Sequence, residues 1–206
     1  MKKRYLLIAG FVVTLGALLP PLYQLAHALF SAHMVQHLIL VLAAAPLLAA
    51  GAPRLPALGA IGVWVLHAGA LWAWHLPVAY DAALDSDLLH GLEHLSFLVT
   101  GVLFWGFVLR RDVSSLERVG LVFATALQSN ALGALLAFAS RPLYASHLGR
   151  TSDWRMSALE DQQLAGAIMW VPPGVVYLVV MLVLLYKWFT HMDAGAIEAR
   201  PAGGPR

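Results

Sequence analysis

The chain has no cysteine and little charge. None of its 206 residues is a cysteine, which excludes disulfides, thiolate metal sites, iron–sulfur clusters and a cysteine nucleophile. Only 12% of the residues are charged and 60% are hydrophobic, whereas soluble domains have about 25% charged residues. This composition excludes a water-soluble globule. Any soft-metal chemistry in this protein must therefore use histidine or methionine.

Apolar runs of about 20 residues, the length that crosses a bilayer as a helix, recur along the sequence. They predict an all-α fold, a polytopic transmembrane bundle of six spans within residues 1–192. We expect the spans at 5–19, 32–50, 57–74, 88–109, 119–139 and 164–188. Residues 193–206 are rich in Ala, Gly and Pro and lack apolar periodicity, which indicates a disordered tail.

The basic residues predict the topology of these spans. Ten fall on one side, namely Lys2, Lys3, Arg4, Arg54, Arg110, Arg111, Arg118, Lys187, Arg200 and Arg206. Only Arg141, Arg150 and Arg155 fall on the other. By the positive-inside rule, both termini are cytoplasmic. The first run fits an uncleaved anchor, which we favour, or a signal peptide with a cleavage site at Ala26-His27-Ala28.

Histidines are concentrated at the outer ends of the predicted helices. His33 and His37 are four residues apart in SAHMVQH, and His90 and His94 have the same spacing in HGLEH. Residues at this spacing project from one face of a helix. Two such pairs at matching depth, if they converge, suit copper or zinc. The alternative is that the rings hydrogen-bond to water, headgroups or neighbouring helices.

Further polar and sulfur-containing side chains lie near these pairs. Glu93 or Asp161 can orient a ring as a hydrogen-bond acceptor, and Met34 and Met169 offer thioether ligands. Membrane methionines, however, commonly only fill space. HGLEH also fits the H-x-x-E-H pattern of some zinc proteases, but nothing else in the sequence predicts a peptide-binding cleft. We therefore expect a protein that is not an enzyme.

These segments together resemble the CtaG family of multi-span cytochrome c oxidase assembly proteins. The resemblance extends from Ser31 to Gly174 and rests on SAHMVQHLIL, AAAPLLAAGAP, WHLPVAYDAAL, DLLHGLEHLSFLVTGVLFW, ASRPLYASH and DQQLAGAIMWVPPG. This family is distinct from the single-span, cysteine-bearing copper chaperone of the same name. The absence of cysteine fits the multi-span family.

The resemblance implies a multi-pass protein of the bacterial plasma membrane that matures a haem–copper oxidase and supplies its copper. The motif positions that it carries over are His33, Met34, His37, His75, Asp81, His90, Glu93, His94, Asp161, Gln162 and Met169. The implied partners are oxidase subunits or other oxidase assembly factors within the lipid bilayer, without nucleic acid.

Our leading hypothesis is a metallochaperone of the respiratory chain with a periplasm-facing copper site. His33, His37, His90 and His94 are the expected ligands, with His75 as a fifth participant. The outer loop from Arg141 to Asp161 is the expected contact with the oxidase. One alternative is a b-type haem protein that transfers electrons. The other is a copper or small-solute transporter, for which only His67, Gln128 and Asn130 lie deep enough.

Overall fold

The computed structural model describes residues 2–53 and 56–198, with side chains through Thr190. These described residues form helices and connecting turns, without a strand. The α-helices are α1 (Lys2–Leu18), α2 (Leu22–Ala28), α3 (Phe30–Leu38), α4 (Ala45–Gly51), α5 (Ala60–Trp74), α6 (Pro77–Leu84), α7 (Asp87–Val108), α8 (Ser115–Ala137) and α9 (Ala158–Glu198). A π-helix, η1 (Ile39–Ala44), joins α3 to α4, and the outer loop contains two 3₁₀ turns, η2 (Ala145–His147) and η3 (Ser152–Trp154).

Four helical segments are long and apolar enough to cross a membrane. They are Phe30–Gly51, Asp87–Val108, Ser115–Ala137 and Ala158–Thr190. Two bent pairs raise the number to six if each pair is one span: α1 with α2 at 43°, and α5 with α6 at 73°. The prediction of an all-helical membrane protein is confirmed, and its six spans correspond to the upper of these two numbers.

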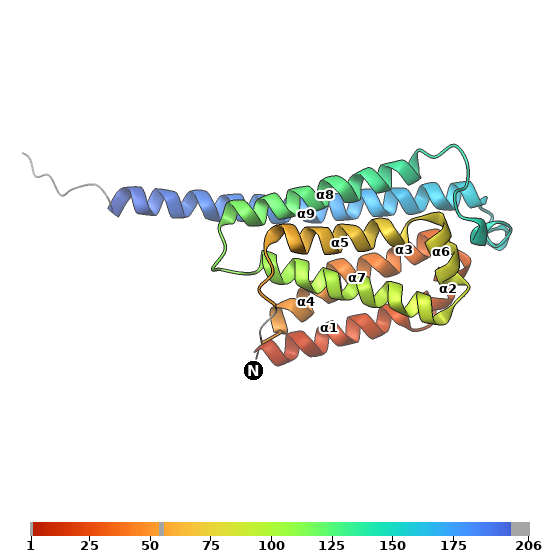
Figure 1. The fold of residues 1–206 in the computed structure, drawn as a ribbon, viewed down its shortest axis with the longest axis horizontal. Coiled ribbons are helices and arrows are strands. Elements are labelled where there is room, and N and C mark those ends of the chain that lie inside the picture. Colours follow the sequence, from red (N-terminus) through yellow and green to blue (C-terminus); the bar gives the residue numbers. More distant parts are fainter. Residues whose placement is uncertain (1, 54–55, 199–206) are drawn as a thin grey trace, which may run out of the picture.

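Both bends occur at prolines. α1 ends before Pro20-Pro21, and α5 ends before Leu76-Pro77. A proline disfavours helical geometry in the residue before it and lacks an amide hydrogen, but it is well tolerated at the first position of a new helix. The bends place the short helices α2 and α6 at one end of the bundle, beside the outer loop between α8 and α9 (Figure 1).

The π-helix after α3 is explained by Pro46. In η1 the amide of Ala45 donates to the carbonyl of Leu40, five residues earlier. In the same register the Val41 carbonyl would pair with residue 46, which is a proline and has no amide hydrogen. The indole Nε1 of Trp105 on α7 donates to this carbonyl instead, at 2.7 Å. Trp105 therefore satisfies a buried backbone oxygen and ties α7 to the α3–α4 span.

Replacing Trp105 with phenylalanine should destabilise the fold through this carbonyl. An unsatisfied buried acceptor costs about 1–3 kcal/mol, and each kcal/mol lowers the thermal midpoint by about 2–4 °C in a chain of this size. Trp64→Phe is the matched control, because the buried Nε1 of Trp64 has no hydrogen-bond partner among the described residues. Thermal unfolding in detergent should show the larger fall for Trp105→Phe. Equal falls would contradict this role of the indole.

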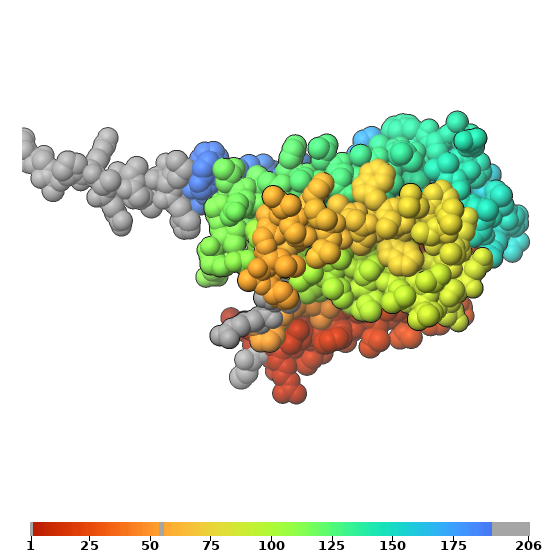
Figure 2. Space-filling view, in the orientation of Figure 1, coloured from red at the N-terminus to blue at the C-terminus, as the bar shows by residue number. Residues whose placement is uncertain are grey.

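Helix α8 packs closely against α9 near the loop that joins them. A Cβ on Gly166 would clash with the backbone of Ala137, and a Cβ on Gly133 would lie 3.0 Å from the Gly166 carbonyl. Small residues of this kind let membrane helices approach closely. The face formed by α5 and α6 has exposed apolar side chains, among them Ile61 and Val78, which are 80% and 85% accessible. Figure 2 shows these two helices, coloured orange to yellow, on the face toward the viewer. Such surface suits contact with lipid.

The last helix is longer than the sequence indicates. α9 runs through Pro172 and Pro173 as one helix to Glu198, so it includes the first six residues of the tail predicted to be disordered. Alanine-rich residues that follow an existing helix extend it without a new nucleation cost. Residues 199–206 of that predicted tail lie outside the described residues. The start of α1 and the end of α9 lie at the same end of the bundle, opposite α2 and α6 (Figure 1).

Candidate metal centre

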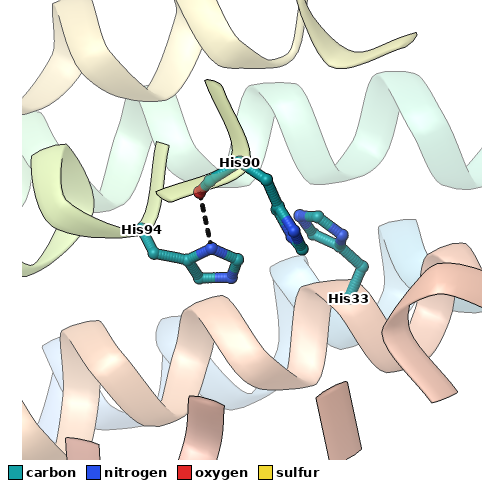
Figure 3. A group of neighbouring side chains, drawn as sticks. All are labelled: His33, His90 and His94. Atoms are coloured by element: carbon teal, nitrogen blue, oxygen red, sulfur yellow. Dashed lines mark hydrogen bonds between the residues drawn. The ribbon is translucent and has the colours of Figure 1, made fainter. Parts of the chain in front are cut away.

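The two histidine pairs face each other between α3 and α7. Ring centroids are 5.2 Å apart for His33 and His90, and also 5.2 Å apart for His37 and His94. Within each pair the centroids are 4.3 and 4.4 Å apart. Figure 3 shows His33 of α3 extending toward His90 and His94 of α7. All four side chains are buried, so the predicted pairs form one cluster inside the bundle.

Donor atoms in this cluster have nearly the spacing of metal ligands. Two groups share His33: one contains His90 and His94, and the other contains His37 and Glu93. In each group, one donor atom per residue lies within 4.8 Å of the others. In a tetrahedral site, ligands bound at about 2.1 Å lie about 3.4 Å from one another, so the most distant donors need to close by up to about 1.4 Å around an ion.

Glu93 lies inside the cluster, beside the rings. Its Oε2 is 3.4 Å from Nε2 of His33, and its Oε1 is 3.5 Å from Nε2 of His37. The Glu93 side chain is fully buried, and neither of its oxygens has a hydrogen bond within the described chain. An ionised carboxylate in this position requires a cation or a protonated ring beside it. Glu93 thus belongs to a group of potential metal ligands, and it accepts no hydrogen bond from either ring, in contrast to the ring-orienting acceptor expected from the sequence.

Most ring nitrogens of the cluster have no hydrogen-bond partner among the described residues. Nδ1 of His94 lies 2.8 Å from the carbonyl of His90 and must donate to it, since a carbonyl only accepts (Figure 3). The Nε2 of a neutral His94 ring is then a lone pair. This Nε2, Nε2 of His90 and both ring nitrogens of His33 and His37 are buried and have no hydrogen-bond partner in the described part of the chain. A bound metal ion would satisfy several of these atoms at once, so the donor set fits one.

Asp161 supports the cluster from a different position than the sequence suggests. Its carboxylate contacts no ring of the cluster by hydrogen bond. It accepts from the backbone nitrogens of Phe30, at 2.6 Å, and Ser31, at 3.1 Å, and from the Ser31 hydroxyl. These donors belong to the first turn of α3, where a helix has unpaired amides and a positive dipole end. Asp161 of α9 therefore fixes the helix that carries His33 and His37.

Asp81 and Gln162 hold the outer loop. Asp81 on α6 accepts from the backbone nitrogen of Ser146 at 3.1 Å and from its hydroxyl at 2.6 Å. Gln162 on α9 accepts from the Leu143 backbone nitrogen at 2.6 Å. The family resemblance implies that Asp81 and Gln162 belong to the site. Their side chains hold the outer loop in place by these bonds and do not join the histidine cluster.

Tyr80 and His147 adjoin the cluster and were not singled out from the sequence. The Tyr80 hydroxyl lies 2.8 Å from Nε2 of His147, and the Tyr80 ring packs on His33 with centroids 5.1 Å apart. Burial lowers the pKa of His147, and its Nδ1 donates to the carbonyl of Ala28 at 3.3 Å. Its Nε2 therefore accepts from Tyr80. The sequence signal was weak: a single tyrosine next to Asp81 in a short apolar helix.

Met34, His75 and Met169 form a separate group next to the cluster. Met34 is fully buried on α3, and its Sδ lies 3.3 Å from Nε2 of His75. Both side chains border a cavity of about 30 Å³, together with His37 and Met169. His75, the expected fifth participant in the cluster, thus contacts the sulfur atom of Met34. Its ring centroid is 6.2 Å from that of His37, a ring of the cluster.

Fold and site together define a helical membrane protein with a buried histidine–glutamate centre in one half of its bundle. The chain belongs to the cytochrome c oxidase caa3 assembly factor family (Caa3_CtaG), whose model matches residues 2–63 and 60–191. The resemblance seen in the sequence motifs is confirmed by this match. Comparisons with curated proteins and with solved structures gave no match.

Proposed function

We propose that this protein is a non-enzymatic assembly factor that binds copper at the His33, His37, His90, His94 and Glu93 cluster and passes it to a haem–copper oxidase. The observation that carries the proposal is the group of buried donor atoms without hydrogen-bond partners, contributed by two facing helices. Membership of an oxidase assembly family supports the same function, since such oxidases contain copper.

The chemistry of the donors favours copper as the cargo. Imidazole nitrogens with one carboxylate suit copper or zinc, whereas magnesium and calcium prefer oxygen ligands. Copper(II) binds such donors more tightly than the other divalent first-row metals do. In an oxidase assembly factor copper is therefore the preferred assignment over zinc.

A groove connects the cluster to the surface. It has a volume of about 370 Å³ and is lined by residues of α1, α2 and α7, among them Tyr23, Asp87, His90 and His94. His27 lies beside it, with its ring edge-on to that of His90 at 4.8 Å. Nδ1 of His27 donates to the carbonyl of Tyr23 at 2.9 Å, which leaves Nε2 as an acceptor. A cargo metal has a short path from this groove to the cluster.

The charge distribution supports an orientation for the protein in a bacterial plasma membrane. Lys2, Lys3 and Arg4 lie in the first turn of α1, and Arg110 and Arg111 follow the end of α7. The cluster lies in the first turns of α3 and α7, at the other end of α7 from these arginines. The positive-inside rule puts the basic end in the cytoplasm and the histidine end toward the periplasm. The outer loop between α8 and α9 is then exposed to oxidase subunits or to other assembly factors.

The geometry gives less support to the two alternative functions. A haem with two histidine ligands needs its macrocycle between the rings, whereas these four rings contact one another directly. A transporter needs free polar groups at depth. Of the three deep polar residues, His67 pairs with the Thr100 hydroxyl at 3.0 Å, and Gln128 accepts from Trp72 at 2.9 Å. Of these three, only the Gln128 Nε2 and the Asn130 Oδ1 are buried without a partner among the described residues, which is too few polar atoms for a path across the bilayer.

Copper content of the detergent-purified protein tests the proposal. The wild type should bind copper stoichiometrically, without a haem absorption band, and the quadruple alanine variant of His33, His37, His90 and His94 should lose it. His147→Gln is the control, because it replaces a buried histidine that belongs to neither donor group and lines neither the groove nor the cavity at Met34. Unchanged copper in the quadruple variant, or a haem band in the wild type, would refute the proposed function.

A further inference from the structure

The thioether sulfur of Met34 faces a ring nitrogen of His75, and neither of these two atoms carries a hydrogen. Nδ1 of His75 lies 2.7 Å from the carbonyl of Leu71 and donates to it. In the neutral ring Nε2 is then a lone pair, and it points at the Met34 Sδ, 3.3 Å away. A thioether has no hydrogen to donate. Two electron-pair donors are therefore in contact inside the bundle.

The alternative protonation states explain this contact less well. Moving the proton to Nε2 would set the Nδ1 lone pair against the Leu71 carbonyl. Protonating both nitrogens would bury a positive charge, and His75 is only 5% accessible. The Tyr144 hydroxyl donates to the His75 carbonyl at 3.0 Å, which helps to hold this residue in place. A soft cation shared by Nε2 and Sδ satisfies both atoms.

The distance between the two donors suits a shared ion. With a metal–nitrogen distance of about 2.0 Å and a metal–sulfur distance of about 2.3 Å, a 3.3 Å separation corresponds to an angle of about 100° at the metal. The adjoining cavity of about 30 Å³ is also bordered by His37 and Met169. This volume has room for an ion or a water molecule.

We propose that Met34 and His75, with Met169 completing the set, form a second metal position that is selective for a monovalent soft cation, Cu(I) or its analogue Ag(I). The inference rests on the proposed copper-handling function and adds a site of different chemistry. Thioether and neutral imidazole donors select Cu(I), and no carboxylate lines this cavity. The neighbouring cluster has Glu93 and four imidazoles, which suit a divalent ion.

The two positions are adjacent through His37. His37 belongs to a donor group of the cluster and also borders the cavity. Its ring centroid is 5.2 Å from that of His94 on one side and 6.2 Å from that of His75 on the other. The cluster and the second position therefore share the His37 side chain.

Silver binding to the purified protein tests this second position. Ag(I) is titrated by calorimetry into the wild type, Met34→Leu and Met181→Leu, the last being a control because Met181 packs in the other half of the bundle. Met34→Leu conserves volume and should keep the fold. We expect its Ag(I) affinity to fall at least about 10-fold, since even residues behind the ligands change metal affinity by that factor. Met181→Leu should match the wild type.

Two further measurements separate this inference from the proposed function. X-ray absorption of the Cu(I)-loaded protein should show the full sulfur signal in the wild type and in Met181→Leu, a reduced signal in Met34→Leu, where only Met169 remains, and none in the double variant Met34→Leu/Met169→Leu. Cu(II) binding by the cluster should be equal in all of these proteins. Unchanged Ag(I) affinity and an unchanged sulfur signal in Met34→Leu would overturn the second position alone. Absent Cu(II) binding in the wild type would instead overturn the proposed function.

Discussion

Replacing Glu93 with glutamine should stabilise the metal-free protein and at the same time remove most of its copper binding. The carboxylate is fully buried between His33 and His37 and has no hydrogen bond among the described residues. An uncompensated buried charge destabilises a fold, and glutamine has the same shape without the charge. When copper is bound, the carboxylate is instead a ligand that balances the charge of the ion.

The measurement is the thermal midpoint with and without copper, together with the copper dissociation constant. We expect Glu93→Gln to weaken copper binding by at least about 100-fold, the upper range for residues that only support a ligand. The midpoint without copper should equal or exceed that of the wild type. The rise in midpoint on adding copper, which follows the ratio of free copper to the dissociation constant, should largely disappear.

Asp87→Asn is a suitable control for this experiment. Asp87 lies on the same helix at the edge of the groove and is not in either donor group. Its substitution should leave both midpoints and copper affinity close to those of the wild type. A Glu93→Gln variant that is less stable without copper and binds copper normally would show that Glu93 has a structural role only.

Replacing Asp161 with alanine should have the largest effect on the fold and should impair the cluster indirectly. The substitution leaves the buried backbone nitrogens of Phe30 and Ser31 without an acceptor. At about 1–3 kcal/mol for each, the expected loss of unfolding free energy is about 2–6 kcal/mol. The first turn of α3 should then fray, and His33 should lose its fixed position toward α7.

Thermal unfolding in detergent, followed by copper titration, checks this prediction. A fall in the midpoint of at least about 5 °C is expected for Asp161→Ala. Asp161→Asn, which keeps one acceptor oxygen, should fall between it and the wild type. Glu160→Gln is the control because Glu160 is exposed and bonds only to Ser157 in its own turn. Equal midpoints for Asp161→Ala and Glu160→Gln would contradict the anchoring role of Asp161.

Local chemistry in the sequence was sufficient to predict most helix positions. α7 begins at Asp87 because the Ser86 hydroxyl accepts from the Leu89 amide, and the predicted span begins one residue later. α8 begins four residues before its predicted span, at a Ser114 cap that lies outside the apolar run. Apolar length indicates a membrane span, whereas capping side chains determine where its helix begins.

The roles of the polar residues were harder to predict than their positions. Asp161 and Ser31 are separated by 130 residues, and so the sequence contains no sign that one caps the helix of the other. The π-helix η1, just before Pro46, also shows what the sequence cannot predict. The proline predicts a carbonyl without a partner, but only the packing of α7 against α3 and α4 brings Trp105 to it.

The sequence by itself determined that this is a helical membrane protein of an oxidase assembly family, with two histidine pairs at helical spacing, because composition, apolar length and the i, i+4 repeat are local properties. Only the tertiary structure decided that the pairs face each other, that Glu93 lies beside the rings of both His33 and His37, and that His75 contacts Met34. Helical periodicity specifies which residues share a face. The rotation of each helix toward its neighbours depends on packing among segments far apart in the chain.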